Sequence, residues 1–148
     1  MTMSTDADVL EYEPSITQYG IQSFTDLHEK TRQDIFRLLR RDWWPRQRSS
    51  FDKYRVVPTQ LEMDESRLVE TQFTRAAVFH VLAYYILPRL SKFTPEGDVF
   101  QEKMKYYLGR FQEEIRLVLE DGVKYDFNDD DVIQDTEQQP VHHGRLIR

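Results

Sequence analysis

The sequence has no cysteine and only five glycines among its 148 residues. The lack of cysteine excludes disulfides, thiolate zinc sites and cysteine nucleophiles. The sequence also contains no phosphate-binding glycine loop, no nucleophile elbow and no HExxH motif. No run of about eighteen apolar residues occurs, and the first residues lack the basic start and apolar core of a signal peptide. We therefore expect a soluble, non-enzymatic protein that carries no cofactor and does not span a membrane.

Charge is unevenly distributed along this acidic chain, whose net charge is −6. Residues 1–20 carry four acids and no base. The segment Arg37–Arg55 carries seven bases against two acids, whereas Glu120–Glu137 carries eight acids against one base. Opposite charges on different copies can attract one another, which favours self-assembly. The same segments can equally be solvated surfaces without a partner.

Two segments in the first half of the chain have the 3.6-residue periodicity of helices. Residues 23–42 form an amphipathic pattern that begins at Ser23, a suitable N-cap. Residues 64–87 also have helical periodicity. Their second half, AAVFHVLAYYIL, is apolar on nearly all sides, which is typical of the central helix of a core. Pro88 should end or kink this helix, because proline has no N–H to donate.

A third helical pattern ends at Gly122, a residue suited to a helix C-terminus. Thr94 followed by Pro95 is one possible start, and Asp98 is the alternative because Gly97 weakens the first. Eight apolar residues of the second and third helices are expected to build the core: Phe73, Ala77, Leu82, Ile86, Phe100, Leu108, Phe111 and Ile115.

Beyond the third helix the periodicity changes from 3.6 to 2. Val123, Tyr125 and Phe127 alternate with polar residues, and a polar NDDD turn precedes Val132–Ile133, which predicts a small hairpin. Residues 134–148 have little apolar surface to bury and indicate an extended tail. The sequence thus predicts a mainly α protein: a small helical bundle of three to four helices with a short C-terminal β-hairpin and an extended C-terminal tail.

These elements divide the chain into three parts. Residues 1–22 are interpreted as an acidic N-terminal arm. Residues 23–122 form a helical body that contains a long basic connection at residues 43–62. Residues 123–148 form the hairpin and a docking tail.

The acidic segment KYDFNDDDVIQDTE, residues 124–137, has most of the spacing of a helix-loop-helix calcium site. It places oxygen-bearing side chains at Asp126, Asn128 and Asp130. Such a loop needs glycine at its sixth position for a sharp turn, but Asp131 stands there, and no helix follows. We therefore interpret the segment as a hairpin with an acidic docking surface and expect no metal site in it.

The histidines are weak indicators of chemistry. His80 lies in the most apolar helix, where a histidine is typically a hydrogen-bonded core or interface residue. His142 and His143 can ligate metals, but no third ligand lies nearby in the sequence. We therefore assign no catalytic or metal-binding role to any of them.

The basic connection RLLRRDWWPRQRSSFDKYR mixes arginines with aromatic residues. Such a mixture can bind phosphate and stack on bases, or it can anchor a protein interface, where Trp, Tyr and Arg are preferred. The overall acidity of the chain favours a protein partner. The residues that we expect at a protein interface lie in this connection, in the acidic segment and in the tail: Arg40, Arg41, Trp43, Trp44, Arg46, Arg48, Tyr125, Phe127, Asp129, Asp130, Asp131, Arg145, Leu146, Ile147 and Arg148.

Several elements follow one another in a characteristic order: a capped first helix, a long connection, the apolar helix TRAAVFHVLAYYILPRL, the long helix FQEKMKYYLGRFQEEIRLVL, the acid-rich GVKYDFNDDDVI and a tail ending in GRLIR. This order resembles that of the small head-tail connector proteins of tailed bacteriophages, also called adaptor or head-completion proteins. The resemblance covers residues 23–148 as an arrangement of elements. The basic connection with its WWP motif departs from the pattern.

The resemblance implies a structural subunit of a homo-oligomeric ring of about twelve copies, made in the host cytoplasm and located in the virion neck. The body would form the ring, while the C-terminal extension would contact the portal protein and tail or stopper proteins. The acidic segment would then be a docking or channel-facing surface that repels passing DNA. The alternative is a small helical nucleic-acid-associated or regulatory protein that uses Arg37–Arg55 on phosphate.

Overall fold

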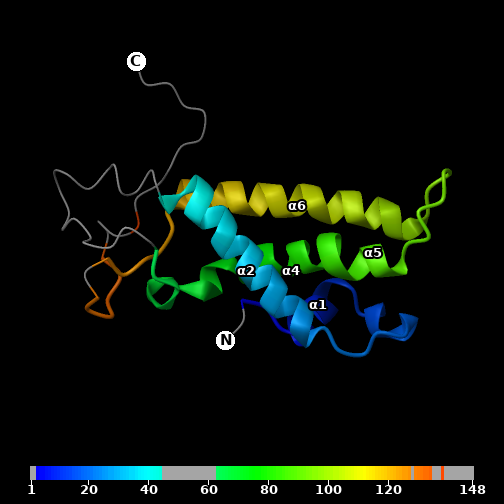
Figure 1. Cartoon of the computed structure of the whole chain (residues 1–148), viewed down its shortest axis with the longest axis horizontal. Helices are drawn as coiled ribbons and strands as arrows, with labels where there is room; N and C mark the ends of the chain where they lie inside the picture. The colour runs from blue at the N-terminus through cyan, green and yellow to red at the C-terminus, as the bar shows by residue number, and fades with distance from the viewer. Residues whose placement is uncertain (1–2, 45–62, 128, 135–137, 139–148) are drawn as a thin grey trace, which may run out of the picture.

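The computed structural model describes residues 3–44, 63–127, 129–134 and 138, and Figure 1 draws the rest of the chain as a grey trace. Most of the basic connection and of the tail therefore lie outside the described residues. Within the described part the protein is mainly helical, as the sequence predicts.

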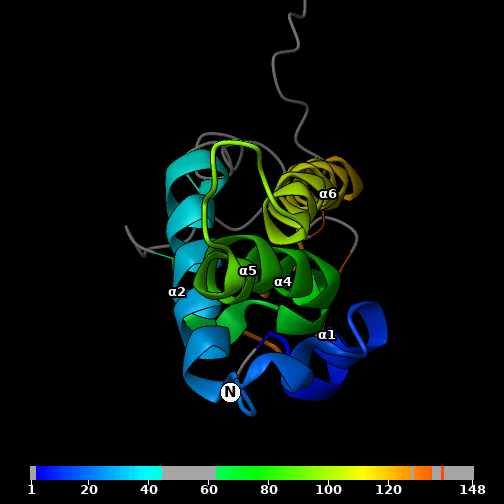
Figure 2. The ribbon, with the colours of Figure 1, turned by 90° about the vertical axis from the view of Figure 1, so that its right-hand side faces the viewer.

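A central rod runs along the long axis of the molecule, formed by α4 (Thr74–Val81), a π-helical segment (Leu82–Ile86) and α5 (Leu87–Leu90). Figures 1 and 2 show this rod between α2 and α6, with α1 against a third side. The remaining elements are α1 (Asp6–Tyr12), a 3-10 turn (Ile16–Tyr19), α2 (Thr25–Asp42), two 3-10 turns (Glu65–Arg67 and Glu70–Phe73) and α6 (Val99–Asp121). The most apolar stretch of the sequence is therefore the centre of the fold.

Most of the predicted core is buried around this rod. Six of the eight predicted residues are buried: Phe73, Ala77, Leu82, Ile86, Phe111 and Ile115. Phe100 and Leu108 are only partly buried and pack against the edge of the core. Both lie in the first half of α6.

The first long helix starts two residues later than Ser23. Phe24 occupies the N-cap position, is 1% exposed, and donates its backbone N–H to the carboxylate of Asp6 at 3.2 Å. Ser23 instead lies within 3.1 Å of the hydroxyl of Thr25. The predicted cap is wrong because α1 supplies the acceptor at this position, while burial of the Phe24 ring fixes the entry of the chain.

The predicted continuous helix over residues 64–87 is interrupted at its start. Residues 64–73 form two 3-10 turns, and regular helix begins only at Thr74. At the other end the rod continues past Pro88 to Leu90. The π-helical segment before it has the longer bond from the N–H of Leu87 to the carbonyl of Leu82, and this change of register accompanies the proline.

α6 has the second of the two starts that the sequence allows. The Asp98 carboxylate accepts from the N–H of Gln101 at 2.8 Å, and the Gln101 side chain accepts from the N–H of Asp98 at 2.8 Å, which is a capping box. The helix ends at Gly122 as predicted, with a φ of 95°. A Cβ at this position would lie 2.5 Å from the carbonyl oxygen of Gln138, so glycine is required both for conformation and for space.

Residues 3–20, interpreted from the sequence as part of an acidic arm, are folded against the body. A capping box between Thr5 and Asp8 starts α1, and Val9 is fully buried. Glu13 binds Lys103 at 2.9 Å and the hydroxyl of Tyr107 at 3.0 Å, which attaches the end of α1 to α6. Asp6, Asp8 and Glu13 thus serve as caps and pairs within the protomer.

The predicted hairpin at residues 123–133 is not shown by the described residues. Residues 124–126 instead pair with residues 67–69 through an isolated antiparallel bridge, with N–H to carbonyl distances of 3.0 and 3.1 Å. Val123, Tyr125 and Phe127 are all buried, but Asp126 between them is buried as well, so the segment does not alternate as a half-exposed strand would. Its pairing partner is the segment that precedes the central rod.

Candidate docking surface

Four aromatic residues that the sequence predicted for an interface form a cluster inside the protomer. Trp43, Trp44, Tyr125 and Phe127 are each at most 5% exposed. The rings of Tyr125 and Phe127 lie 4.7 Å apart, and Trp44 stacks on Phe127 at 6.1 Å. The expectation that these four side chains contact a partner is corrected, because the chain after α6 folds back onto the end of α2 and buries them.

The aromatic cluster contains one buried donor without a partner. The indole nitrogen of Trp43 makes no hydrogen bond within the described part of the chain. A buried unpaired donor costs about 1–3 kcal/mol, so the packing of this ring must outweigh that cost. Trp43 is therefore a residue of the core at this end of the molecule.

Arg67, which sequence reasoning missed, attaches the C-terminal segment to the body. Its Nη1 donates to the carbonyl of Phe127 at 3.2 Å, and its other nitrogens lie 3.6 Å from Asp64 and 3.5 Å from Asp129. The N–H of Asp64 donates to the hydroxyl of Tyr125 at 2.9 Å. The R-L-V run before the apolar helix gave no sequence signal for this role, because Phe127 and Asp129 lie about sixty residues away from Arg67.

The acidic turn after Phe127 separates buried from exposed carboxylates. Asp126 is 6% exposed and accepts from the N–H groups of Asp130 at 3.2 Å and Asp131 at 2.8 Å. Asp129, Asp130 and Asp131 are exposed, as expected for an acidic surface. The carboxylate that would begin a calcium loop is thus occupied by backbone donors of the turn itself.

Two of the three described arginines of the basic segment Arg37–Arg55 are paired within the protomer, and the third, Arg37, is exposed. Arg40 forms an ion pair with Glu65, and both the Nε and the Nη2 of Arg41 donate to Asp42 at 2.8 Å. The remaining predicted interface residues lie outside the described residues: Arg46, Arg48, Arg145, Leu146, Ile147 and Arg148. The structure therefore brings the predicted interface residues together only around the aromatic cluster.

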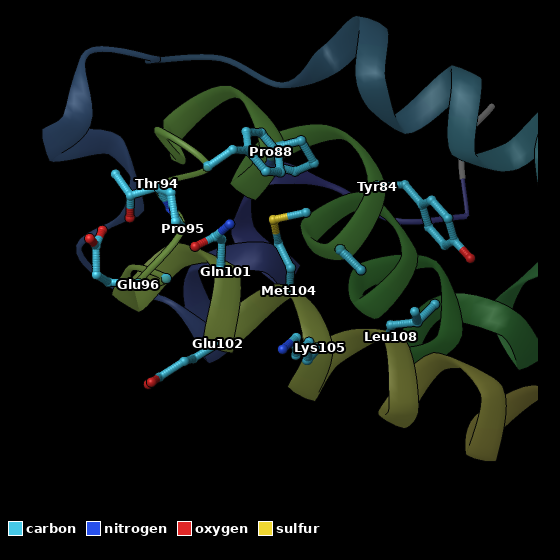
Figure 3. A pocket seen from close by; sticks show the side chains of 13 residues that line it. Tyr84, Pro88, Thr94, Pro95, Glu96, Gln101, Glu102, Met104, Lys105 and Leu108 are labelled. Carbon is cyan, nitrogen blue, oxygen red and sulfur yellow. The ribbon is translucent and has the colours of Figure 1, made fainter.

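A groove that the sequence did not reveal opens at the opposite end of the molecule, between α5, the loop of residues 91–98 and the first half of α6 (Figure 3). Its volume is about 560 Å³. Figure 3 shows Met104 pointing from α6 toward Pro88, with Leu108 and Tyr84 at one end. An apolar groove of this size is within the range of ligand and peptide sites.

The loop wall of the groove holds an aromatic ring in solvent. The Asp98 carboxylate accepts from the hydroxyl of Ser91 and from the N–H of Lys92, both at 3.0 Å. Phe93 follows with a φ of 49°, in the left-handed region that disfavours a bulky L-residue, and it is 56% exposed. Tyr84, on the facing element, is 49% exposed. Exposed rings on both sides of an apolar groove mark a candidate site for binding another chain.

Charged side chains lie along the rim of this groove. Glu96 on the loop and Glu102 on α6 lie toward the same end, and Lys105 lies one turn further along α6 (Figure 3). All three side chains are exposed. The rim thus has an acidic end, which favours a cationic group on a bound partner.

A network at the junction of α4 and the π-helical segment positions Tyr84. His80 is 6% exposed, lies 3.1 Å from the hydroxyl of Thr31 and stacks on Tyr84 with ring centroids 4.4 Å apart. The next residue, Tyr85, points to α2 and donates to Asp34. π-helical turns frequently occur at functional sites. Here the turn directs Tyr84 to the groove and Tyr85 to the opposite side of the rod.

Burial controls the protonation of this network. It lowers the pKa of His80 to about 4, with Asp34 opposing the shift. Burial and the hydrogen bond to Asp34 raise the pKa of Tyr85 to about 12. At neutral pH both side chains are therefore uncharged, and His80 serves as the hydrogen-bonded core residue that the sequence predicts.

Ser4, His28 and Asp6 form a hydrogen-bonded chain that resembles a nucleophile array. The Ser4 hydroxyl lies 2.7 Å from Nδ1 of His28, and Nε2 of His28 lies 2.8 Å from Asp6. Ser4 is only 1% exposed, whereas a nucleophile must reach its substrate. These contacts attach the first residues to α2, and we assign them a structural role.

Comparison with protein-family models, curated proteins and solved structures found no match for this chain. Among the described residues, no helix has both the length and the apolar character needed to cross a membrane. Functional interpretation therefore depends on the geometry described above and on the order of elements along the chain.

Proposed function

We propose that this chain is a structural subunit of the head-tail connector ring of a tailed bacteriophage, where it docks on the portal and joins the capsid vertex to the tail. The observation that carries the proposal is the apolar groove with exposed Tyr84 and Phe93 at one end of a helical body. Exposed aromatic residues around an apolar groove are typical of protein contacts. The order of elements, which resembles that of small connector proteins, supports the same function.

The distribution of charge supports assembly from many copies. The acidic residues 129–131 are exposed and can meet basic residues of a neighbouring copy, or can repel the backbone of passing DNA. The proposed assembly is a ring of about twelve subunits in the virion neck, made in the host cytoplasm, with portal and tail or stopper proteins as partners. In this assembly the acidic segment, for which the sequence predicts a hairpin, and the extended tail act as docking elements.

The alternative, a nucleic-acid-associated or regulatory protein, has weaker support. Two of the three described arginines of the segment Arg37–Arg55 are engaged within the protomer, Arg40 by Glu65 and Arg41 by Asp42, whereas Arg37 is exposed. An arginine already paired with a carboxylate gains less from a phosphate contact. We therefore keep the alternative as the outcome to be tested against the connector.

The connector proposal is tested by native mass spectrometry and negative-stain electron microscopy of the purified chain, alone and mixed with the portal protein of the same virus. We expect closed rings, or ring formation on the portal. A chain that stays monomeric at all concentrations and does not bind the portal would overturn the proposal. DNA binding whose affinity falls steeply with salt would instead favour the alternative.

A further inference from the structure

We propose that the groove between α5 and α6 binds the C-terminal tail of a second copy of this chain, with Leu146 and Ile147 in the apolar groove and the flanking arginines at its acidic rim. This inference rests on the proposed function in one respect, because it names the contact by which copies of a connector subunit join. It requires no residue of the portal or of the tail machinery.

The groove has the properties of a surface that is covered in an assembly. Phe93 is held in the left-handed region and is 56% exposed, although burial of a phenylalanine ring is favourable. The Asp98 carboxylate fixes this arrangement by binding both Ser91 and Lys92. The apolar ring is thus exposed by a specific local structure and not by a loose one.

The tail matches the groove in chemistry. Its sequence GRLIR places two adjacent aliphatic residues between Arg145 and Arg148. The groove offers Met104 and Leu108 on its α6 side and carboxylates at one end of its rim. A short cationic segment with an aliphatic centre therefore satisfies both the apolar wall and the acidic end. Lys105, the one base among the described lining residues, lies one turn along α6 from Glu102.

The position of the tail favours a neighbour over the same copy. Gln138 lies against Gly122, at the opposite end of α6 from the groove. Met104 precedes Gly122 by eighteen residues, a distance of about 27 Å along the helix. Leu146 follows Gln138 by eight residues and reaches at most about 29 Å when fully extended. Within one copy the tail reaches Met104 only as a nearly straight segment along α6, whereas the tail of a second copy has no such restriction.

The two ends of α6 then have complementary roles. One end carries the groove, and the other carries the root of the tail. A contact between different surfaces of two copies is heterologous, and it repeats until the assembly closes into a ring or extends as a filament. A connector ring requires a contact of this kind.

The first experiment measures binding of a fluorescent synthetic peptide of residues 138–148. The acceptor is the full chain with Leu146→Asp and Ile147→Asp, so that its own tail does not compete. We expect saturable binding that weakens at least tenfold when the acceptor also carries Phe93→Ser and Glu102→Lys. Tyr106→Ser is the matched control, because Tyr106 is a 61% exposed aromatic residue of α6 outside the groove, and it should leave the affinity unchanged. Equal binding to all acceptors, or no binding, would overturn the proposal.

The second experiment distinguishes a neighbour's tail from the chain's own tail. One full-length variant carries the disabled groove (Phe93→Ser, Glu102→Lys), and the other carries the disabled tail (Leu146→Asp, Ile147→Asp). By native mass spectrometry each should be monomeric alone, and an equimolar mixture should form heterodimers, because only one groove and one intact tail remain to pair. Peptide binding combined with a monomeric parent protein and no heterodimers would show that the tail binds its own groove, which overturns the proposal.

The two proposals can fail separately. Rings that persist at the parental level in the tail variant would overturn tail docking and leave the connector function intact. Tail-dependent assemblies that extend as filaments and do not bind the portal would support tail docking and overturn the connector function.

Discussion

The two ends of the molecule use aromatic residues in opposite ways. At the end of α2, Trp43 and Tyr125 are buried in a cluster, and Arg67 attaches the covering segment. At the other end, Phe93 and Tyr84 are exposed around a groove whose loop is held by a single carboxylate. Both ends are rich in apolar surface, so composition does not distinguish them. What distinguishes them is whether another segment of the same chain covers the rings.

The comparison teaches that a conspicuous aromatic motif is not by itself an interface. The WWP motif and its flanking arginines predict an interface, but the two tryptophans are buried within the protomer. The loop LPRLSKFTPEG contains one phenylalanine, and its sequence predicts no interface. Its ring is exposed because Asp98 fixes the loop, and an apolar group that stays exposed is available to a partner.

The largest expected effect separates the two ends by stability. Trp43→Ala should reduce the free energy of unfolding by about 3–5 kcal/mol, since it removes a large buried ring. Phe93→Ala, the matched change at the groove, should stay within about 0.5 kcal/mol because its ring is exposed. Urea denaturation of both variants measures the difference, and equal losses would remove the distinction between the ends.

A further variant tests the unpaired donor of the aromatic cluster. Trp43→Phe keeps an aromatic ring and removes the buried indole N–H, so its loss of stability should be clearly smaller than that of Trp43→Ala. The same urea denaturation provides the measurement. A loss as large as that of the alanine variant would mean that the size of the indole ring, and not its aromatic packing alone, fixes this end.

Arg67→Met tests what holds the covering segment in place. The change should lower the free energy of unfolding, measured by urea denaturation, by about 2–3 kcal/mol. It removes the charged donor to the Phe127 carbonyl while retaining an apolar stem. The control is Arg75→Met, an exposed arginine paired with Glu114 at 3.5 Å, which should cost at most about 0.5 kcal/mol. If both variants melt like the parent, Arg67 does not attach the C-terminal segment.

His80, which lies in α4 between the two ends of the molecule, should make stability depend on pH. The pKa of His80 is lowered to about 4 in the fold from its ordinary value of 6.5, so the unfolded chain takes up the proton first as the pH falls. This group then contributes a loss of about 2 kcal/mol between pH 7 and pH 5, and the loss continues until the pH falls below about 4. His80→Gln should have a flatter dependence of unfolding free energy on pH, and parallel curves for the two proteins would contradict this assignment.

The smallest expected effect concerns calcium at the acidic turn. Because the Asp126 carboxylate accepts from two backbone N–H groups, about 5 mM calcium should leave the melting temperature unchanged. Differential scanning fluorimetry with and without calcium measures this. A saturable rise that Glu137→Gln abolishes would mean that the segment is a metal loop after all.

Local sequence patterns determined the helices and several of their ends. The apolar run AAVFHVLAYYIL lies at the centre of the fold, Asp98 with Gln101 caps α6, and Gly122 ends it. These features were predictable because they depend on residues within a few positions of one another. The capping box of Thr5 and Asp8 is the same kind of local signal at the start of α1.

Only the tertiary structure decided which apolar residues are covered. Tyr125 pairs with Leu68 and packs on Trp43, contacts that join segments about sixty to eighty residues apart and leave no trace in local periodicity. The groove is equally non-local, because α5, the loop and α6 meet there and Phe93 stays exposed. The sequence by itself therefore determined where helices form, through short-range hydrogen bonding and periodicity. Burial depends on contacts between distant segments, and only the folded chain decided which aromatic residues build the core and which remain free to bind.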